Sequence, residues 1–139
     1  MSLTRVTGSC LCGDIAYEVE IDAGRILNCH CTRCQKTHGA AFGTYAFAVG
    51  ETLKFTKGES LLQEYKTASG SRAFCSRCGS RLMSFTENRT DYLGIVLACV
   101  DGEVDAKPRA NIFIENKAAW FTPAETPPSF EGIPKDIFE

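Results

Sequence analysis

Apolar and polar residues alternate over residues 14–21, the period of a strand with one buried face. Ala16, Glu18 and Glu20 occupy the polar face. The following turn-forming residues, 22–24, are expected to end the strand. The apolar face of this predicted half-buried strand consists of Ile15, Tyr17, Val19 and Ile21.

The same patterns predict a series of short elements further along the chain. A second strand is expected over residues 25–31, and a short helix over residues 32–38. Gly39 would end that helix by adopting the left-handed conformation. Glycine, asparagine and aspartate then separate further strand candidates, which cover residues 42–49, 52–57, 61–66, 71–74, 81–86 and 92–100. The pattern predicts a mostly β fold of antiparallel strands with little helix.

The C-terminal part of the chain has a different character. Residues 111–115 are a last short apolar segment, and four prolines then lie among polar residues. Because proline interrupts both helices and strands, this tail is expected to wrap the domain as irregular chain. Its expected anchors are Trp120, Phe121 and Phe130.

Length and composition point to an ordinary globular protein. A chain of 139 residues is long enough for one hydrophobic core. Its content of 44% hydrophobic and 23% charged residues excludes a disordered or fibrous protein. We therefore predict a single domain over residues 1–139.

The charged residues argue against two classes of partner. The net charge is −2, and the 15 Lys and Arg residues are scattered rather than clustered. Nucleic acids and anionic membranes require a cationic face, so neither is an expected partner. No stretch approaches the roughly 18 apolar residues of a membrane span, and no basic segment leads into an apolar one at the N-terminus. We expect a cytoplasmic protein, and the sequence leaves its oligomeric state open.

Eight cysteines in such a protein need an explanation other than disulfides, because cytosolic reductants keep thiols reduced. Their tight spacing suits a tetrahedral metal ion such as zinc, whereas a Cys-x-Cys disulfide would have poor geometry. The spacing therefore predicts metal binding. Seven of the cysteines fall into three clusters: Cys10 with Cys12, then Cys29, Cys31 and Cys34, and finally Cys75 with Cys78.

Seven clustered thiols divide naturally into four plus three, and Cys99 is expected to be a small core residue. Four thiolates close the coordination shell of a structural zinc, whereas three leave a position for water or substrate. Counting does not say which clusters combine. The repeated Cys-x-Arg-Cys pattern also fits a zinc ribbon, whose ligands would be Cys31, Cys34, Cys75 and Cys78.

The order and surroundings of these clusters carry a resemblance to a known family. The motifs are Gly-Ser-Cys-Leu-Cys-Gly at residues 8–13, Cys-His-Cys-Thr-Arg-Cys-Gln-Lys-Thr-His-Gly-Ala at 29–40, and Phe-Cys-Ser-Arg-Cys-Gly at 74–79. Together with the stretch from Ile112 to Phe130, they resemble the glutathione-dependent formaldehyde-activating enzymes, the S-(hydroxymethyl)glutathione synthase-like family that includes centromere protein V. The resemblance covers almost the whole chain.

The resemblance implies a β-tent fold organised around two zinc ions per chain. The first, structural zinc would be held by Cys10, Cys12, Cys75 and Cys78. The second, at the active site, would be held by Cys29, Cys31 and Cys34 and bound less firmly. The implied activity is that of a carbon–sulfur lyase, which forms S-(hydroxymethyl)glutathione from glutathione and formaldehyde. An enzyme for another thiol or electrophile and a non-catalytic zinc-binding interaction module are the alternatives.

Several residues near the second cluster are candidates for further roles. Arg33 and Lys36 could bind a carboxylate of the thiol substrate or be solvated charges. His38, one helical turn after Cys34, could approach the open metal position or stabilise the helix end. His30 is expected to point to the opposite face, while Phe42 and Tyr45 could line a cleft or pack in the core. Asn111 stands where family members often have histidine.

Overall fold

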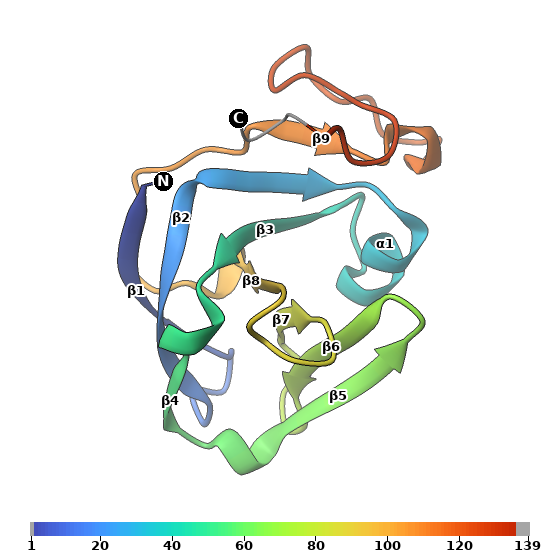
Figure 1. Ribbon diagram of the computed structural model, residues 1–139. Helices are drawn as coiled ribbons and strands as arrows, with labels where there is room; N and C mark the ends of the chain where they lie inside the picture. The colour runs from blue at the N-terminus through green and yellow to red at the C-terminus, as the bar shows by residue number, and fades with distance from the viewer. Residues whose placement is uncertain (1, 136–139) are drawn as a thin grey trace.

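The computed structural model describes residues 2–135 and confirms the mostly β architecture with little helix. Within these residues nine strands form one sheet, in the order β1-β2-β3-β8-β7-β6-β5, with β4 and β9 also paired to β2 (Figure 1). The strands are β1 Leu3–Ser9, β2 Ala16–Cys29, β3 Gly43–Ala48, β4 Lys54–Lys57, β5 Leu62–Thr67, β6 Gly70–Cys75, β7 Arg81–Phe85, β8 Leu93–Val96 and β9 Ala110–Ile112.

The helical elements are short. The helix α1, Thr32–His38, has the predicted bounds, and Gly39 ends it with a left-handed φ of 61°. Single turns of 3-10 helix replace parts of two predicted strands, since residues 52–57 and 92–100 are extended only within β4 and β8. The 3-10 turns are η1 Gly50–Thr52, η2 Glu59–Leu61, η3 Leu97–Cys99 and η4 Ile114–Asn116.

Strand β2 is the longest strand and joins the two halves of the fold. Its first half pairs antiparallel with β1 and β4, and its second half pairs antiparallel with β3 and parallel with β9. The predicted alternation at the start of this strand is confirmed by burial, since each member of the apolar face has at most 1% of its surface exposed: Ile15, Tyr17, Val19 and Ile21.

The prediction that residues 22–24 end the first strand was wrong. The chain stays extended there, and the pairing with β3 shifts register between Ile21 and Ile26. The buried Asp22 carboxylate accepts hydrogen bonds from the backbone N–H groups of Ser2, at 3.1 Å, and Gly24, at 2.9 Å. Turn-forming residues therefore mark an irregularity within one long strand, a known role of such residues in sheets.

The buried side chains form two adjoining clusters. The larger cluster lies around β2, β7 and β8 and includes Val19, Leu82 and Ile95. The smaller one lies at the other end of β2 and contains Cys29 and Cys34 among apolar neighbours. The apolar side chains of this smaller cluster are Leu27, Tyr45, Val96, Ala110 and Ile112. The core therefore places one cysteine cluster against apolar packing from several strands.

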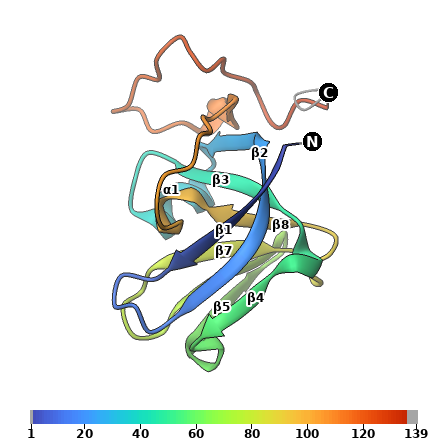
Figure 2. The same ribbon diagram turned by 90° about the vertical axis from the view of Figure 1, so that its left-hand side faces the viewer.

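The C-terminal tail returns to β9 and lies across the β2 end of the molecule (Figures 1 and 2). The backbone of Asn111 accepts from the N–H of Phe130 and donates to the carbonyl of Pro128, both at 2.9 Å. Phe130 packs on the smaller core cluster, and the ring of Phe121 lies 6.0 Å from that of His30. Both therefore serve as the predicted anchors.

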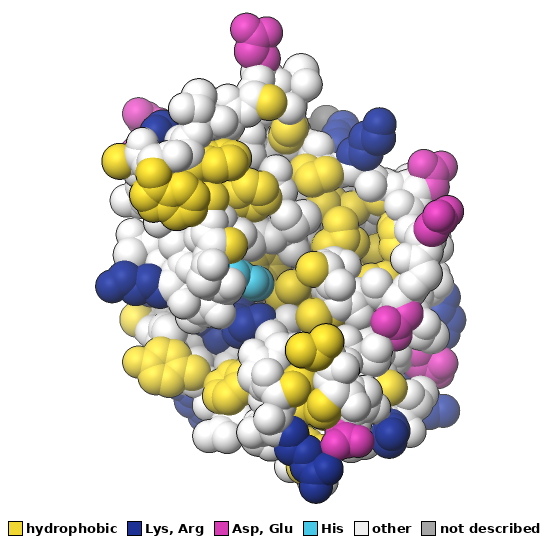
Figure 3. Space-filling view, turned by 180° about the vertical axis from the view of Figure 1, so that it is seen from behind, with side chains coloured by type: hydrophobic (Ala, Val, Ile, Leu, Met, Phe, Trp, Pro, Cys, Tyr) yellow, Lys and Arg dark blue, Asp and Glu magenta, His cyan; other side chains and the backbone are white. Residues whose placement is uncertain are grey.

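Trp120 was wrongly predicted to be an anchor, because 75% of its surface is exposed. Its ring contacts only the edge of its neighbour Phe121 among the ring pairs of the described residues. Figure 3 shows that hydrophobic side chains gather in several groups on the face opposite to that of Figure 1. None of the helices within residues 2–135 has the length and apolar character needed to cross a bilayer.

Candidate functional site

The first cysteine cluster joins two tight turns. Cys10 and Cys12 lie after β1, and Cys75 and Cys78 lie at and after the end of β6. Their four sulfur atoms all lie within 4.8 Å of one another. All eight cysteines of the chain are free thiols. Segments more than sixty residues apart thus meet at one group of four soft donors, and we call this group the four-thiol cluster.

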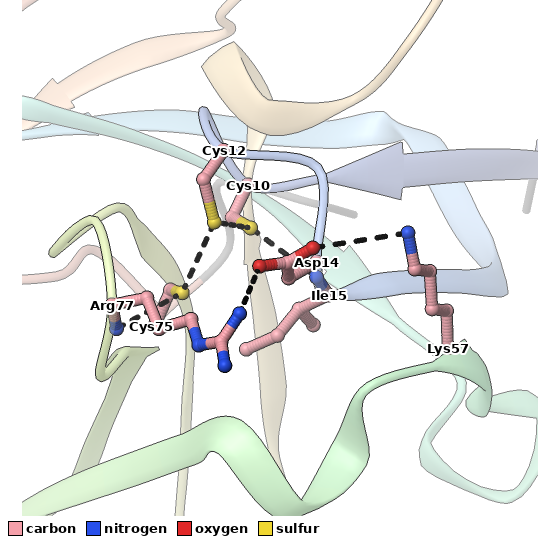
Figure 4. A network of polar contacts seen from close by, with 7 residues as sticks. All are labelled: Cys10, Cys12, Asp14, Ile15, Lys57, Cys75 and Arg77. Carbon is pink, nitrogen blue, oxygen red and sulfur yellow. Dashed lines mark hydrogen bonds and ion pairs between the residues drawn. The ribbon is translucent and has the colours of Figure 1, made fainter.

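The spacing of the four-thiol cluster suits a metal ion. The Sγ atom of Cys12 lies 3.5 Å from that of Cys10 and 3.8 Å from that of Cys75 (Figure 4). A tetrahedral ion with bonds of about 2.3 Å to sulfur sets its ligand atoms about 3.8 Å apart. Two backbone N–H groups also point at these sulfurs, from Ile15 to Cys10 at 3.3 Å and from Arg77 to Cys75 at 3.4 Å. The cluster could hold a metal ion.

Glycines shape both turns of this cluster. Gly13 and Gly79 have φ values of 79° and 77°, which side chains rarely allow. Each donates its N–H to the carbonyl of the first cysteine of its turn, at 3.0 Å to Cys10 and 2.8 Å to Cys75. The sequence therefore places glycine where the backbone must curl to bring two sulfurs together.

Charges around the four-thiol cluster pair with each other at the surface. Arg77 donates to the Asp14 carboxylate at 2.7 Å, and the Lys57 ammonium lies 3.9 Å from the same carboxylate (Figure 4). The hydrogen bond from Arg77 lowers the pKa of Asp14. The Ser80 hydroxyl lies 3.3 Å from the Cys78 sulfur and lowers the pKa of that thiol to about 5.

The second cysteine cluster forms where β2 passes into α1. Cys29 ends β2, Cys31 is the N-cap of α1 and Cys34 lies in the first turn of the helix. Their sulfur atoms lie within 4.8 Å of one another, and the Cys31 sulfur accepts the backbone N–H of Cys34 at 3.3 Å. Hydrogen bonds among these thiols raise the pKa of Cys29 and lower that of Cys31. We call this group the three-thiol cluster, and it too could hold a metal ion.

The three-thiol cluster opens onto a cavity of about 640 Å³. Such a volume falls in the range of roughly 300 to 1,000 Å³ that is usual for small-molecule sites. All three cysteines line the cavity, whereas none of the four-thiol cluster does. The other lining groups used below are the aromatic residues Tyr45, Phe47, Phe85, Tyr92 and Phe113, the arginines Arg33 and Arg72, and Asn116.

The hydroxyl of Tyr45 joins the cysteines to three basic side chains. It lies 3.8 Å from the Cys34 sulfur and accepts hydrogen bonds from Arg81, at 3.0 Å, and Arg72, at 3.4 Å. Nε2 of His38 is the nearest partner, at 2.7 Å. Because the guanidinium groups only donate, the hydroxyl proton goes to His38, whose Nε2 must be unprotonated.

The electrostatics of this group agree with that assignment. Burial, with Arg81 and Arg72 nearby, lowers the pKa of His38 to about 4. Burial, reinforced by Cys34, raises the pKa of Tyr45 to about 12. At neutral pH both groups are therefore uncharged, and the positive charge of the network resides on the two arginines.

Residues 5–116 match the sequence profile of the family described as glutathione-dependent formaldehyde-activating enzyme. The chain belongs to this family. The match includes all seven clustered cysteines, and it agrees with the resemblance that the motifs carry. Membership indicates an enzyme of the formaldehyde-activating, lyase-like kind.

Two relatives and one solved structure support the assignment. A Halomonas elongata protein, provisionally named a glutathione-dependent formaldehyde-activating enzyme, is 32% identical over 123 residues, which cover 81% of this chain and 77% of the relative. An uncharacterised lyase of Schizosaccharomyces pombe is 27% identical over 125 residues, covering 83% and 89%. A crystal structure of a Rhodobacter sphaeroides protein shares the fold, with a TM-score of 0.60, 23% identity and coverage of 71% and 91%.

The cysteines group as the family resemblance implied, in sets of four and three. The zinc-ribbon alternative required Cys31 and Cys34 to join Cys75 and Cys78, and the described structure does not bring these two pairs together. Cys99, outside both groups, is half-buried against the core and donates to the carbonyl of Arg81 at 3.2 Å.

The two candidate substrate contacts lie in different surroundings. Arg33 lines the cavity and donates to the Ser69 hydroxyl at 3.1 Å, which connects α1 to the turn between β5 and β6. Lys36 lies on an exposed part of α1 and is not among the described residues that line the cavity. Arg33 is therefore the better-placed cation for an anionic ligand.

His30 and Asn111 belong to the packing beneath the tail. His30 is fully buried, and its Nε2 lies 3.0 Å from the Asn111 side-chain oxygen. That oxygen also accepts from Asn28 at 3.1 Å, and the Asn111 amide donates to the Pro127 carbonyl. Phe42 packs on His30, and neither Phe42 nor Asn111 is among the described cavity-lining residues. Asparagine at position 111 thus connects β9, β2 and the tail.

Sequence reasoning did not find Arg72 and Arg81. They lie on β6 and β7, about forty residues after the three-thiol cluster, and no motif surrounds them. The available signal was a position on each strand that should have been apolar by its neighbours, namely Arg81 directly before the buried Leu82 and Met83.

Proposed function

We propose that this protein is a zinc-dependent carbon–sulfur lyase that interconverts glutathione plus formaldehyde with S-(hydroxymethyl)glutathione. The observation that carries the proposal is the three-thiol cluster in the wall of a ligand-sized cavity. Family membership supports glutathione and formaldehyde as the reactants. A cytoplasmic location and the absence of a nucleic-acid partner remain predictions from the sequence.

Both clusters offer the thiolate donors that zinc prefers. Cys10, Cys12, Cys75 and Cys78 would hold a structural zinc, and Cys29, Cys31 and Cys34 would hold a second one. A zinc ion with three sulfur ligands supplies an electrophilic centre that favours the thiolate form of an incoming thiol. The four-thiol cluster has no such open position, which is why we assign it to the fold.

The chain's own residues would bind and enclose the reactants. Arg33 and Asn116, at the start and end of the polar wall, are suited to the carboxylate and amide groups of a glutathione-like tripeptide. The aromatic wall of Tyr45, Phe47 and Tyr92 would exclude water from the reacting atoms.

The reaction itself needs no redox partner. The thiolate sulfur forms a bond to the aldehyde carbon, the π electrons of the carbonyl move to its oxygen, and that oxygen takes up one proton to become the hydroxyl. The thiol has released one proton on binding, so protons balance. Among the described residues no carboxylate lines the cavity, and the released proton is therefore expected to leave to solvent.

The test is the rate of exchange between free and hydroxymethylated glutathione, followed by NMR in an equilibrium mixture with formaldehyde. Thiols add to aldehydes unaided, so the rate is compared with a mixture lacking enzyme and with Cys31→Ser as the matched blank. We expect faster exchange with wild-type protein alone. Equal exchange in all three samples would refute the proposed activity and favour a non-catalytic zinc module.

A further inference from the structure

Arg72 and Arg81 are two cations whose charges are not balanced by carboxylates. Only 9% of the surface of Arg81 is exposed, and Arg72 is half-buried. The ion pairs of the described residues involve other cations, at Arg5, Lys57, Arg77 and Arg89. Burying an arginine without an opposite charge is costly, so this arrangement requires a compensating anion.

The anion nearest to both arginines is the three-thiol cluster. Arg72 Nη1 lies 3.7 Å from the Cys34 sulfur and 3.4 Å from the Tyr45 hydroxyl. Arg81 reaches the same hydroxyl at 3.0 Å, so Tyr45 lies between its guanidinium and Cys34. Burial opposes the charge of Arg72, yet the Cys34 sulfur more than offsets this and raises the arginine's pKa.

Backbone and hydroxyl groups hold Arg81 in place without neutralising it. Its Nη1 donates to the carbonyls of Ala73 and Met83, and its Nη2 also donates to the Ser84 hydroxyl. The Nε atoms of both arginines are buried and have no hydrogen-bond partner among the described residues. The strands thus fix two positive charges beside the cysteines at a cost that neutral partners do not repay.

The number of charges matches a particular state of the site. Three thiolates around a divalent ion carry one net negative charge, and a thiolate added from a substrate raises this to two. Two arginines balance the second state rather than the first. At the four-thiol cluster, by contrast, the nearest arginine is already paired with Asp14.

We propose that Arg72 and Arg81 are positioning residues whose paired charge lets the three-thiol cluster accept a fourth, substrate-derived thiolate. This inference rests on the proposed function, because it assumes that a thiol binds at this cluster. It differs from a carboxylate-binding role, since the charge acts on the sulfur end of the ligand and should affect every thiol alike.

Arg72 is the better position for a test, because Arg81 also holds strand carbonyls. Calorimetry on the zinc-loaded protein would measure the affinity for glutathione and for 2-mercaptoethanol, a thiol without carboxylates. Arg72→Gln should weaken both thiols by about tenfold, the usual scale for a charge-assisted contact. Arg72→Lys should restore most of the affinity, and Arg5→Gln, on β1, should leave it unchanged.

The outcomes separate the inference from the proposed function. A loss confined to glutathione, or unchanged affinity for both thiols in Arg72→Gln, would overturn the charge-balance role. Wild-type binding of 2-mercaptoethanol without glutathione would count against the proposed substrate and leave the arginine comparison intact, whereas no thiol binding at all would end both. Should Arg72→Gln fail to fold, Arg72→Lys decides: affinities within about threefold of wild type support the role and a tenfold loss of both refutes it.

Discussion

The two cysteine clusters use the same donor atom in opposite surroundings. The four-thiol cluster closes on itself between two glycine-containing turns, beside charges that pair with each other. The three-thiol cluster lies in a cavity wall beside arginines that no carboxylate of the described residues pairs with. The difference teaches that ligand count and environment change together: the closed cluster links distant segments, and the open one faces space and uncompensated positive charge.

The largest expected effect separates the clusters by their role in folding. Cys75→Ser should cost about 5 kcal/mol or more of unfolding free energy, or prevent soluble expression, because it removes the link between β1 and β6. Cys31→Ser should leave the fold standing, since serine is also a favourable N-cap residue for α1. Circular dichroism and soluble yield provide the measurement. An unfolded Cys31→Ser beside a native Cys75→Ser would reverse our assignment.

Removal of metal should also distinguish the clusters. Protein purified without chelator is expected to approach two zinc ions per chain, and mild chelation should remove one of them first, because three protein ligands hold an ion less firmly than four. The first loss should leave circular dichroism unchanged. Metal analysis along a chelator series checks this, with Cys31→Ser as the control that lacks the labile ion. Simultaneous loss of both ions would contradict the comparison.

The hydroxyl network gives a smaller expected effect. Tyr45→Phe leaves Arg81 and His38 without their shared partner, and should lower the unfolding free energy by about 1–3 kcal/mol. Urea denaturation measures the change. Tyr65→Phe is the matched control, because 64% of Tyr65 is exposed on β5. Equal stability of the two variants would mean that the Tyr45 hydroxyl contributes nothing to the fold.

The smallest expected effect is a pH dependence. The pKa of His38 is about 4 in the folded protein, below its ordinary value of 6.5, so the unfolded chain binds the additional proton between these values. Its contribution to stability is therefore complete above pH 6.5 and declines as the pH falls toward 4. His38→Gln should flatten the decline between pH 7.5 and pH 5.5 in urea denaturation. Parallel curves for wild type and variant would contradict this pKa.

Local sequence signals predicted much of the fold and both cysteine groups. The apolar alternation of β2, the bounds of α1 and the left-handed Gly39 depend on neighbouring residues, and all are as expected. The division of the cysteines came from family resemblance, because spacing alone left the zinc ribbon open. Asp22 misled the reading, since a buried carboxylate that accepts two backbone hydrogen bonds looks like a turn residue in sequence.

The missed part of the site depends on contacts between distant strands. Arg72 and Arg81 reach Tyr45 only because β3, β8, β7 and β6 are neighbours in the sheet. Nothing in their local sequence encodes that order. The exposure of Trp120 has a similar origin, since the tail packs through Phe121 and Phe130 and turns Trp120 outward. Strand order and the path of the tail are long-range properties that residue patterns do not specify.

The most direct test of the comparison is ¹¹³Cd NMR of the protein with cadmium in place of zinc, because the cadmium chemical shift responds to the number of sulfur ligands. The account predicts two resonances in wild type and one in Cys31→Ser. Glutathione should move only the resonance that is missing from Cys31→Ser, toward the position of the four-sulfur site. A single resonance in wild type, or a glutathione-dependent shift of the other resonance, would contradict the division into a closed structural cluster and an open thiol-binding one.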